Sequence, residues 1–524
     1  MLINRPKLMR LLRDRSFLIK AAATIGISAV VIGFVVSHLT ISAGVRSAFH
    51  PDQLEEIQKS VERIEKHLGQ KLSGIDAFRF AILYRDSDKP IDTLEMNIKE
   101  SESITKTERV QLISLLHGLH GNEIQKKSAE AELANLASED RRFSHEFYGM
   151  VLDKADETEA AILEYQKEAT LFDEAYFSRR KVIDLLKQRH DWEQLRQIYR
   201  TEPYHSELQV AESMAIAAKV HDFGYLFRMI FESSLKHLNW WSVSLGLFSA
   251  AIWFVIIGQF RGLERGHLAQ YFASIVLGIF STFLTVFVII LQRDLLDFTE
   301  PTQTATPADQ VIFWIAGVGL REEFLKLLCF IPIAFFLKKR AGDLTALLCA
   351  GMVGLGFALQ ENIGVYFGFS PNFQPWGRFL TATFFHIALT GIVGLAFFQM
   401  IQRRGRGWEH FLAEFLLMVF AHGMFNAVQS IALLADYSSV GRMLILALVA
   451  YRFFRLADGL MQPNRSLGIS PLSVFVIGSA TLVGVVFVAV CVGLPFRDVF
   501  PEYLDALAGM VPIAFIYINQ FRDA

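Results

Sequence analysis

Cysteine is scarce in this chain. Only three of the 524 residues are cysteines, and Cys329, Cys349 and Cys491 all lie within apolar runs, so neither a disulfide framework nor a cysteine metal site is indicated. A charge imbalance is also missing: the net charge is −2, which gives no reason to expect nucleic acid as a partner. The Gly-x-Ser-x-Gly motif of serine hydrolases is absent. His145-Glu146 is followed by Phe-Tyr-Gly, so the His-Glu-x-x-His motif of zinc proteases is absent too.

Long apolar runs dominate what is present. The chain is 52% hydrophobic, too apolar for an ordinary soluble protein, yet 20% charged, which is too much for a bare bundle of spans. We therefore predict an all-α, polytopic transmembrane helix bundle with one extramembrane domain. About 20 apolar residues cross a bilayer. About ten runs qualify, at 21–41, 240–260, 268–291, 311–337, 344–369, 379–401, 411–434, 440–454, 472–494 and 504–521.

Basic residues set the expected orientation. Six lysines and arginines precede the first run, which we interpret as a retained signal anchor rather than a cleaved signal peptide. Basic loops then alternate with acidic or neutral ones, as the positive-inside rule requires for a cytoplasmic N-terminus. We expect a multi-pass protein of a bacterial inner or plasma membrane. Its predicted parts are a basic N-terminus with signal anchor (1–45), an extracytoplasmic domain (46–238), two spans with a linker (239–310), a four-span catalytic core (311–435) and C-terminal spans (436–524).

The domain at 46–238 reads as helical. Lys154–Tyr165 aligns with Gln188–Tyr199 at an offset of about 34 residues, which is the period of tetratricopeptide repeats. Few consensus positions are shared, so an irregular helical domain is the alternative. No catalytic constellation occurs here. We expect this domain to bind the substrate or a regulator.

Ionisable side chains interrupt four successive spans of the predicted core. A charge at mid-bilayer costs about 2.5–3.5 kcal/mol or more, so its presence indicates a functional site by default. At a rise of about 1.5 Å per residue, the groups fall in one belt, roughly 12–20 Å from the outer ends of their spans. The set consists of Glu322, Glu323 and Lys326, then Glu361 and Asn362, then His386 and Thr390, then His422 and Asn426.

This mixture suits hydrolysis. A carboxylate in an apolar site can take a proton from water, and histidines can orient that water or protonate a leaving amine. The Asn426 amide can donate to a developing oxyanion. We assign Glu323 as the base because its depth matches that of His422, and we pair Glu322 with Lys326. Each polar group also has a structural alternative, as an ion pair or as an interhelical hydrogen bond.

The ordered motifs resemble one known family. Glu322-Glu323-x-x-Lys326, Glu361-Asn362, His386-x-x-x-Thr390 and His422-Gly-x-Phe-Asn426, on successive spans, look like those of the PrsW intramembrane proteases, relatives of the CAAX prenyl proteases and bacteriocin-processing enzymes. The resemblance spans 311–435. It implies that the paired glutamates and the two histidines cleave membrane-protein substrates, such as single-span proteins and classically anti-sigma factors.

Two questions stay open on the sequence alone. The family is described both as metalloprotease-like and as glutamate-based, so zinc held by His386, His422 and Glu323 is an alternative to metal-free chemistry. A proton-coupled transporter or a membrane scaffold is the non-enzymatic alternative, because buried Glu and His chains also relay protons. A transporter would be expected to show two related halves, and the polar motifs show no such symmetry.

Overall fold

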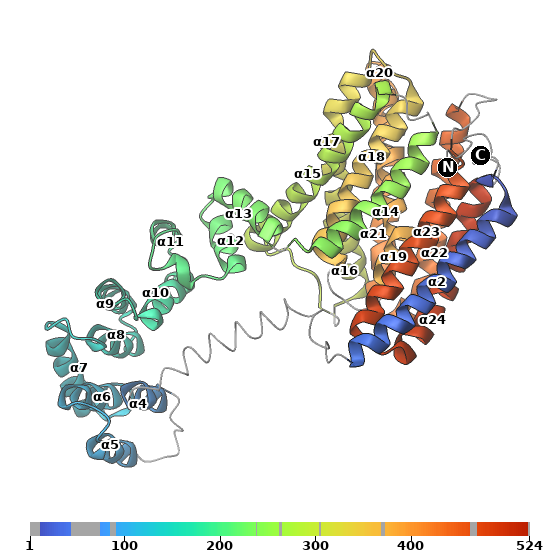
Figure 1. Cartoon of the computed structure of the whole chain (residues 1–524). Helices are drawn as coiled ribbons and strands as arrows, with labels where there is room; N and C mark the ends of the chain where they lie inside the picture. Colours follow the sequence, from blue (N-terminus) through green and yellow to red (C-terminus); the bar gives the residue numbers. More distant parts are fainter. Residues whose placement is uncertain are drawn as a thin grey trace. The chain divides into compact units, whose positions relative to one another are not determined.

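The computed structural model describes residues 11–42, 74–83, 91–236, 238–260, 265–302, 305–367, 373–461 and 469–521. Throughout these ranges the chain forms helices joined by turns, without a strand, so the all-α prediction is confirmed (Figure 1). The chain divides into two compact units. We call residues 52–229 the small unit, and residues 1–51 together with 230–524 the bundle.

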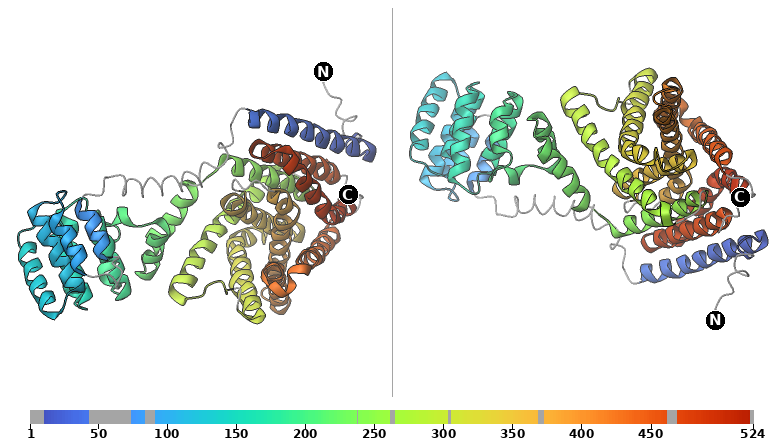
Figure 2. Two further views of the ribbon diagram at one scale, coloured as in Figure 1. Left: turned by 90° about the horizontal axis from the view of Figure 1, so that it is seen from below. Right: turned by 90° about the horizontal axis from the view of Figure 1, so that it is seen from above.

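The small unit is a row of short helices (Figures 1 and 2). From α5 to α12 each helix packs against the next one in the chain, and α4 packs against α6. Its helices are α4 (Gly74–Leu83), α5 (Ile91–Glu100), α6 (Lys106–His120), α7 (Glu123–Ala137), α8 (Ser144–Lys154), α9 (Thr158–Leu171), α10 (Tyr176–Gln188), α11 (Trp192–Ile198) and α12 (Val210–Lys219), followed by α13 (Phe223–Lys236). The turns within three successive helical hairpins each contain a residue with positive φ: Asp156, His190 and His221. These three residues are spaced at 34 and 31 residues, so the aligned segments occupy equivalent positions. A relation to tetratricopeptide repeats stays a prediction.

A carboxylate from one helix caps the preceding helix of the row. Phe143, at the N-terminal cap of α8, has a left-handed backbone with φ of 68° and makes no side-chain capping bond of its own. Glu168 of α9 supplies the cap instead: its carboxylate accepts from the Phe143 N–H at 2.6 Å and from the Glu146 N–H at 3.3 Å. Burial, assisted by the nearby Glu146 charge, raises the pKa of Glu168 to about 7.

This raised pKa predicts a specific pH dependence. Because the native pKa of Glu168 lies above its ordinary value of 4.5, the native unit binds the extra proton between about pH 4.5 and 7. The stabilisation is thus complete below about pH 4.5 and is lost as the pH rises through 7, by at most about 3 kcal/mol. We expect the opening free energy of the α8 amides, from hydrogen exchange corrected for intrinsic rates, to fall over this window. Glu168→Gln should remove that fall; an unchanged pH profile in the variant would assign the effect to other groups.

The bundle contains the predicted apolar runs. Its elements are α2 (Arg15–Ser42), α14 (Trp240–Gln259), α15 (Arg265–Leu296), α16 (Pro307–Ile312), η2 (Phe313–Gly319), α17 (Leu320–Leu337), α18 (Asp343–Glu361), η3 (Asn362–Tyr366), α19 (Gln374–Arg378), η4 (Phe379–Thr383), α20 (Phe384–Gln402), α21 (Trp408–Ser430), η5 (Ala432–Tyr437), α22 (Ser438–Leu460), α23 (Pro471–Gly493) and α24 (Phe496–Phe521). Among the described residues, eight helical stretches are long and apolar enough to cross a membrane. The two remaining predicted spans, in α17 and α22, are also helical but carry more charge, so the total of ten crossings stays a prediction.

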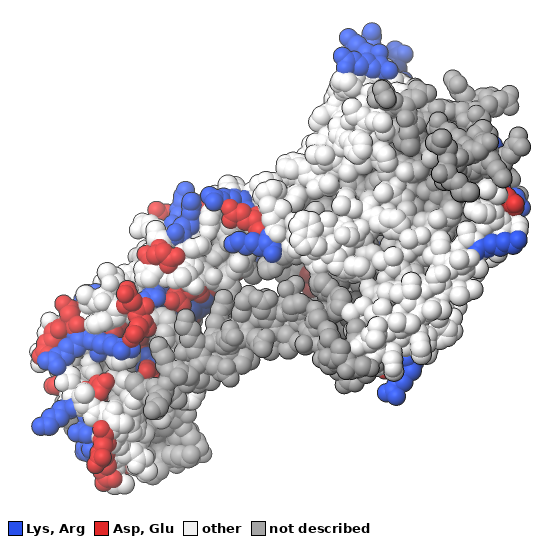
Figure 3. Space-filling model, in the orientation of Figure 1, with Lys and Arg blue, Asp and Glu red and all other residues white. Residues whose placement is uncertain are grey.

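The central helices of the bundle are α18 and α20. In each, 89% of the most apolar stretch is buried, and α18 packs against both α15 and α20 (Figure 1). The N-terminal helix α2 lies at the edge, where it packs on α23 (Figure 2). On the face shown in Figure 3, the bundle is almost free of charge between its ends, where lysines and arginines gather, whereas the small unit shows both signs. A long uncharged belt is what a surface in contact with lipid requires.

Candidate active site

Three helices of the predicted core change their winding next to a site residue. A π-helical segment, η2, ends three residues before Glu322. Another, η3, begins directly after Glu361, and η4 ends three residues before His386. Such widened turns inside α-helices are rare and are frequent at functional sites. The three π-helical segments and the polar motifs therefore indicate the same functional site.

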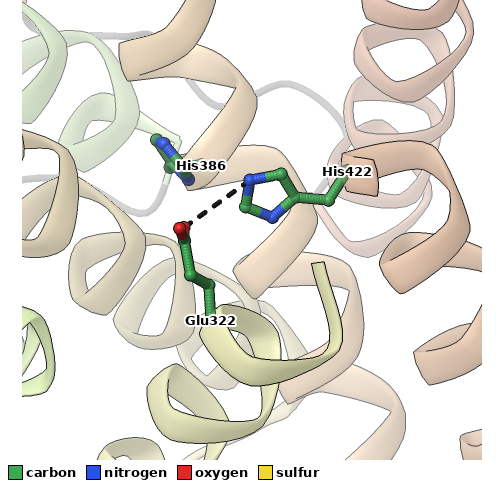
Figure 4. A group of neighbouring side chains, drawn as sticks. All are labelled: Glu322, His386 and His422. Atoms are coloured by element: carbon green, nitrogen blue, oxygen red, sulfur yellow. Dashed lines mark ion pairs between the residues drawn. The ribbon is translucent and has the colours of Figure 1, made fainter. Parts of the chain in front are cut away.

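Glu322, His386 and His422 converge from three helices. Glu322 lies on α17, His386 on α20 and His422 on α21, and one nitrogen or oxygen of each lies within 4.8 Å of the others (Figure 4). All three side chains are buried, with 7%, 4% and 3% of their residues' surface exposed. The structure thus brings together one glutamate and both histidines of the predicted set.

The orientation of His422 is fixed by Glu323. His422 Nδ1 lies 2.8 Å from Glu323 Oε1, and this contact turns Nε2 toward Glu322 Oε2 at 3.6 Å. That oxygen has no hydrogen-bond partner among the described residues. A buried carboxylate oxygen next to a ring nitrogen needs a proton or a metal ion between the two atoms.

Lys326 forms ion pairs with both glutamates, and the contact with Glu323 is the shorter of the two. Lys326 Nζ lies 2.7 Å from Glu323 Oε1 but 3.8 Å from the nearest Glu322 oxygen. Both spacings along the helix allow an ion pair, so the sequence could not decide between them. Lys326 is fully buried and lies over the Phe357 ring, on the inner side where Glu323 also points. Both glutamates therefore contact His422: Glu323 lies at Nδ1 and Glu322 at Nε2.

His386 is held from both sides. Lys326 Nζ donates to its Nδ1 at 2.9 Å, and its Nε2 lies 3.2 Å from Glu361 Oε2. Glu361 is held in turn by Arg378, whose Nη2 lies 2.5 Å from the same oxygen. Both ring nitrogens therefore have partners, and His386 can bind a metal ion only if one of these two contacts opens.

The residues that could hold a metal differ from the predicted set. The described part of the chain places Glu322, rather than Glu323, in a possible three-ligand group with His386 and His422. Two imidazoles and a carboxylate match the donor set of catalytic zinc sites that keep one position open. The unpartnered Glu322 oxygen, and the Glu323 carboxylate that orients His422 from behind, fit such a centre as well.

The remaining predicted residues lie around this centre. Asn362 accepts from Arg378 Nε at 2.6 Å and donates to Thr383 at 3.2 Å, which ties η3 to η4. Asn426 is half-buried and lines a cavity of about 1010 Å³ that also contains Glu322, His386 and His422. Thr390 is buried one turn along α20 from His386, and its hydroxyl makes no hydrogen bond to the site within the described structure.

Sequence reasoning missed Arg378. It lies over the Tyr366 ring, 3.5 Å from the ring centroid, while it pairs with Glu361. A signal for it was present. On the predicted topology Arg378 stands at the outer end of a span, where the positive-inside rule disfavours arginine. An arginine that breaks this rule needs a partner within the bundle.

Comparison with known proteins agrees with this geometry. Residues 266–454 match the model of the PrsW family, described as intramembrane metalloproteases. This segment is similar to the PrsW family. Members of that family are intramembrane proteases, which hydrolyse peptide bonds. The match runs from α15 into α22 and includes every predicted site residue, while the small unit lies outside it. No curated protein and no solved structure matches the chain.

Glycines bring the helices of the PrsW segment into close contact. A Cβ on Gly423, beside His422, would lie 2.4 Å from the Ile315 Cα in η2. A Cβ on Gly354 in α18 would lie 2.2 Å from the His386 carbonyl oxygen. Small residues of this kind let membrane helices approach each other, and here they position the two histidines.

Gly423→Ala should therefore reduce activity. The clash is with backbone, so α21 or η2 must shift, and displacement of a catalytic group by about 1 Å can cost about 100-fold in rate. We expect cleavage to fall at least about tenfold in protein that still folds, measured by activity and circular dichroism. Gly459→Ala is the matched control, because a Cβ there meets nothing within 4 Å. Full activity of Gly423→Ala would show that this contact does not set the position of His422.

Proposed function

We propose that the chain cleaves peptide bonds of membrane-protein substrates, with Glu322, His386 and His422 as its hydrolytic centre. The observation that carries this proposal is the pair of buried atoms, Glu322 Oε2 and His422 Nε2, that face each other at 3.6 Å. Lys326 Nζ lies 3.8 Å from the same oxygen, which accepts no hydrogen bond among the described residues. A water molecule between Glu322 Oε2 and His422 Nε2 would be a donor to both. Such an arrangement supports proton removal from water at the moment of attack.

Each surrounding residue has a defined part in this proposal. Glu322 accepts the proton of the attacking water, in place of Glu323, which we assigned from the sequence. Glu323 keeps His422 in the Nδ1-protonated form, and Lys326 balances the buried charge of Glu323. Asn426, four residues after His422 and on the same face of α21, donates to the oxyanion.

The ion pair of Glu361 and Arg378 orients His386. Arg378 fixes Glu361, and Glu361 fixes the His386 ring, so this histidine can position the scissile carbonyl. These contacts come from α18, η3 and α19, whose relative positions the Asn362 bonds maintain. Thr390 stays a proposed supporting residue of α20.

The same three residues would hold zinc, and the family's description as metalloproteases supports this form of the proposal. Bound zinc would supply a Lewis acid for the carbonyl and lower the pKa of a bound water to about 7. Glu322 would then be a ligand, while Glu323 would still orient His422. Both forms require all three residues.

A reconstituted cleavage assay on single-span membrane proteins tests the function. Purified protein in lipid vesicles should cut at least one candidate, and the Glu322→Gln variant should not. Loss of activity on chelation, restored by zinc, would select the metal form, and activity that resists exhaustive chelation would select the metal-free form. If no single-span candidate is cut by well-folded protein, the proposed substrate class is wrong.

The small unit has a separate proposed part. We place it outside the cytoplasm, because the basic N-terminal flank and the basic alternate loops predict this orientation. There it would contact the substrate or a regulator through its stacked helices. Reporter fusions within the described helices of the small unit should read as exported. A cytoplasmic readout would reverse the orientation of every span.

A further inference from the structure

Arg442 carries a positive charge that no carboxylate in the described part of the chain balances by an ion pair. It lies in the first turns of α22, with its guanidinium carbon 4.4 Å from the centroid of the Phe425 ring. Its Nη1 donates to Gln429 Oε1 at 2.6 Å, whereas its buried Nε has no partner in the described structure. Within the described ranges no carboxylate oxygen lies within 4.0 Å of it. A half-buried guanidinium with only an amide and an aromatic ring as partners is poorly compensated.

Three carboxylates line the same cavity, those of Glu300, Glu322 and Glu361, and none of them forms an ion pair with Arg442 in the described structure. Arg442 lines the same cavity as the hydrolytic centre. Arg293 pairs there with Asp294, and Arg378 pairs with Glu361. Arg378 is also close enough to Arg442 to repel it electrostatically, which increases the cost of leaving Arg442 without a counter-charge. The wall of the cavity is therefore positive at this point.

The position of Arg442 relative to His422 follows from helix geometry. Its partners Phe425 and Gln429 lie three and seven residues after His422 on α21. At 1.5 Å per residue, Gln429 is about 10 Å along the helix from His422. An extended peptide covers about 3.3 Å per residue, so that distance corresponds to about three substrate residues.

We propose that Arg442 is an anion-binding subsite that takes a carboxylate of the substrate, about three residues from the bond that is cut. The distance from the cleaved bond rests on the proposed function, whereas the binding of a carboxylate does not. A substrate carboxylate is the occupant that the observations favour, because Arg442 faces the cavity in which a substrate must lie to reach Glu322. Arginine and carboxylate form strong charge-assisted hydrogen bonds.

Binding of designed transmembrane peptides tests the subsite. The probes are dye-labelled leucine–alanine peptides of one span, each with a single Asp at one of several successive positions, together with matched Asn peptides. They are titrated onto the Glu322→Gln protein in nanodiscs of phosphatidylcholine, so that nothing is cut and no anionic lipid competes. At one or two positions the Asp peptide should bind on the order of tenfold more tightly than its Asn partner.

Variants on the same helix provide the decisive comparison. Arg442→Gln should remove the difference between Asp and Asn peptides, and Arg442→Glu should shift the preference to a Lys peptide at the same position. Arg455→Gln, an exposed arginine of α22, should leave the Asp preference intact. A Lys preference in Arg442→Glu would show that the variant site is folded. A loss of the Asp preference in Arg442→Gln would then report on the charge of the arginine and not on misfolding.

Three results would overturn the proposal. They are an Asp preference that survives Arg442→Gln, the absence of an Asp preference at every position, and an Arg442-dependent binding of phosphatidylglycerol without any effect of Asp. The last would assign the subsite to a lipid phosphate. Cleavage of the same peptides by the unmutated protein is scored separately. An Arg442-dependent Asp preference without cleavage of any peptide would contradict the proposed function and support the subsite.

Discussion

Replacement of Glu322 by glutamine should reduce cleavage by roughly a thousandfold and leave the bundle folded. Glutamine keeps the size and most of the hydrogen bonding of glutamate, but it neither accepts a proton from water nor binds zinc as a carboxylate does. General-base catalysis alone contributes about 10²–10⁴-fold. Because Glu322 Oε2 makes no hydrogen bond within the described structure, the substitution breaks no existing one at that oxygen. Initial cleavage rates of a single-span substrate in vesicles measure the effect.

Two further variants sharpen this prediction. Glu323→Gln should cost less, about 10–100-fold, because Glu323 acts through His422. Glu409 is an exposed carboxylate on α21. Glu409→Gln should leave the cleavage rate unchanged, and it serves as the control for differences between protein preparations. If Glu323→Gln were inactive and Glu322→Gln retained wild-type rates, the assignment of the two glutamates would have to be exchanged.

Lys326→Met should be the most destabilising single change in the core. Lys326 and Glu323 are 0% and 1% exposed, and removal of one partner leaves the other charge buried without compensation. Breaking a buried pair in this way costs about 3–5 kcal/mol. The free energy of unfolding in mixed micelles should fall by that amount, and His386 would also lose its Nδ1 partner.

A second substitution distinguishes charge from packing. In Lys326→Met/Glu323→Gln the Glu323 charge that the lysine balanced is removed as well, so most of the lost stability should return, although activity should not. Equal stability of Lys326→Met and the wild type would mean that the pair does not stabilise the bundle. A double variant as unstable as the single one would point to the packing of the lysine stem instead.

From the sequence we could predict that these side chains lie close together, but not which of them pair with each other. Intramembrane charge is costly, so Glu322, His386 and His422 stood out against apolar surroundings, and their similar depths placed them in one belt. Depth along a helix axis has no bearing on direction around it. Glu322 and Glu323 differ by about 100° in direction, and only the packing of α17 against its neighbours shows that Glu323 lies at His422 Nδ1 and Glu322 at His422 Nε2.

Other features depended on geometry that no local pattern contains. The π-helical segments η2, η3 and η4 rotate the residues beside them, and an ideal helical period misses this change. The contact between Glu361 and Arg378 crosses from α18 to α19. In the small unit, the repeat period was visible in the sequence, whereas the cap that Glu168 provides to α8 depends on the neighbouring helix.

A double-mutant cycle between Glu322 and His422 tests the central claim most directly. If these residues act as one hydrolytic unit, Glu322→Gln and His422→Ala should each nearly abolish cleavage, and the double variant should be little slower than either single one. All four proteins are compared for cleavage rate in the same vesicles, with circular dichroism as the check on folding. Losses that multiply in the double variant, or wild-type cleavage by either folded single variant, would contradict the claim that the two residues form one catalytic centre.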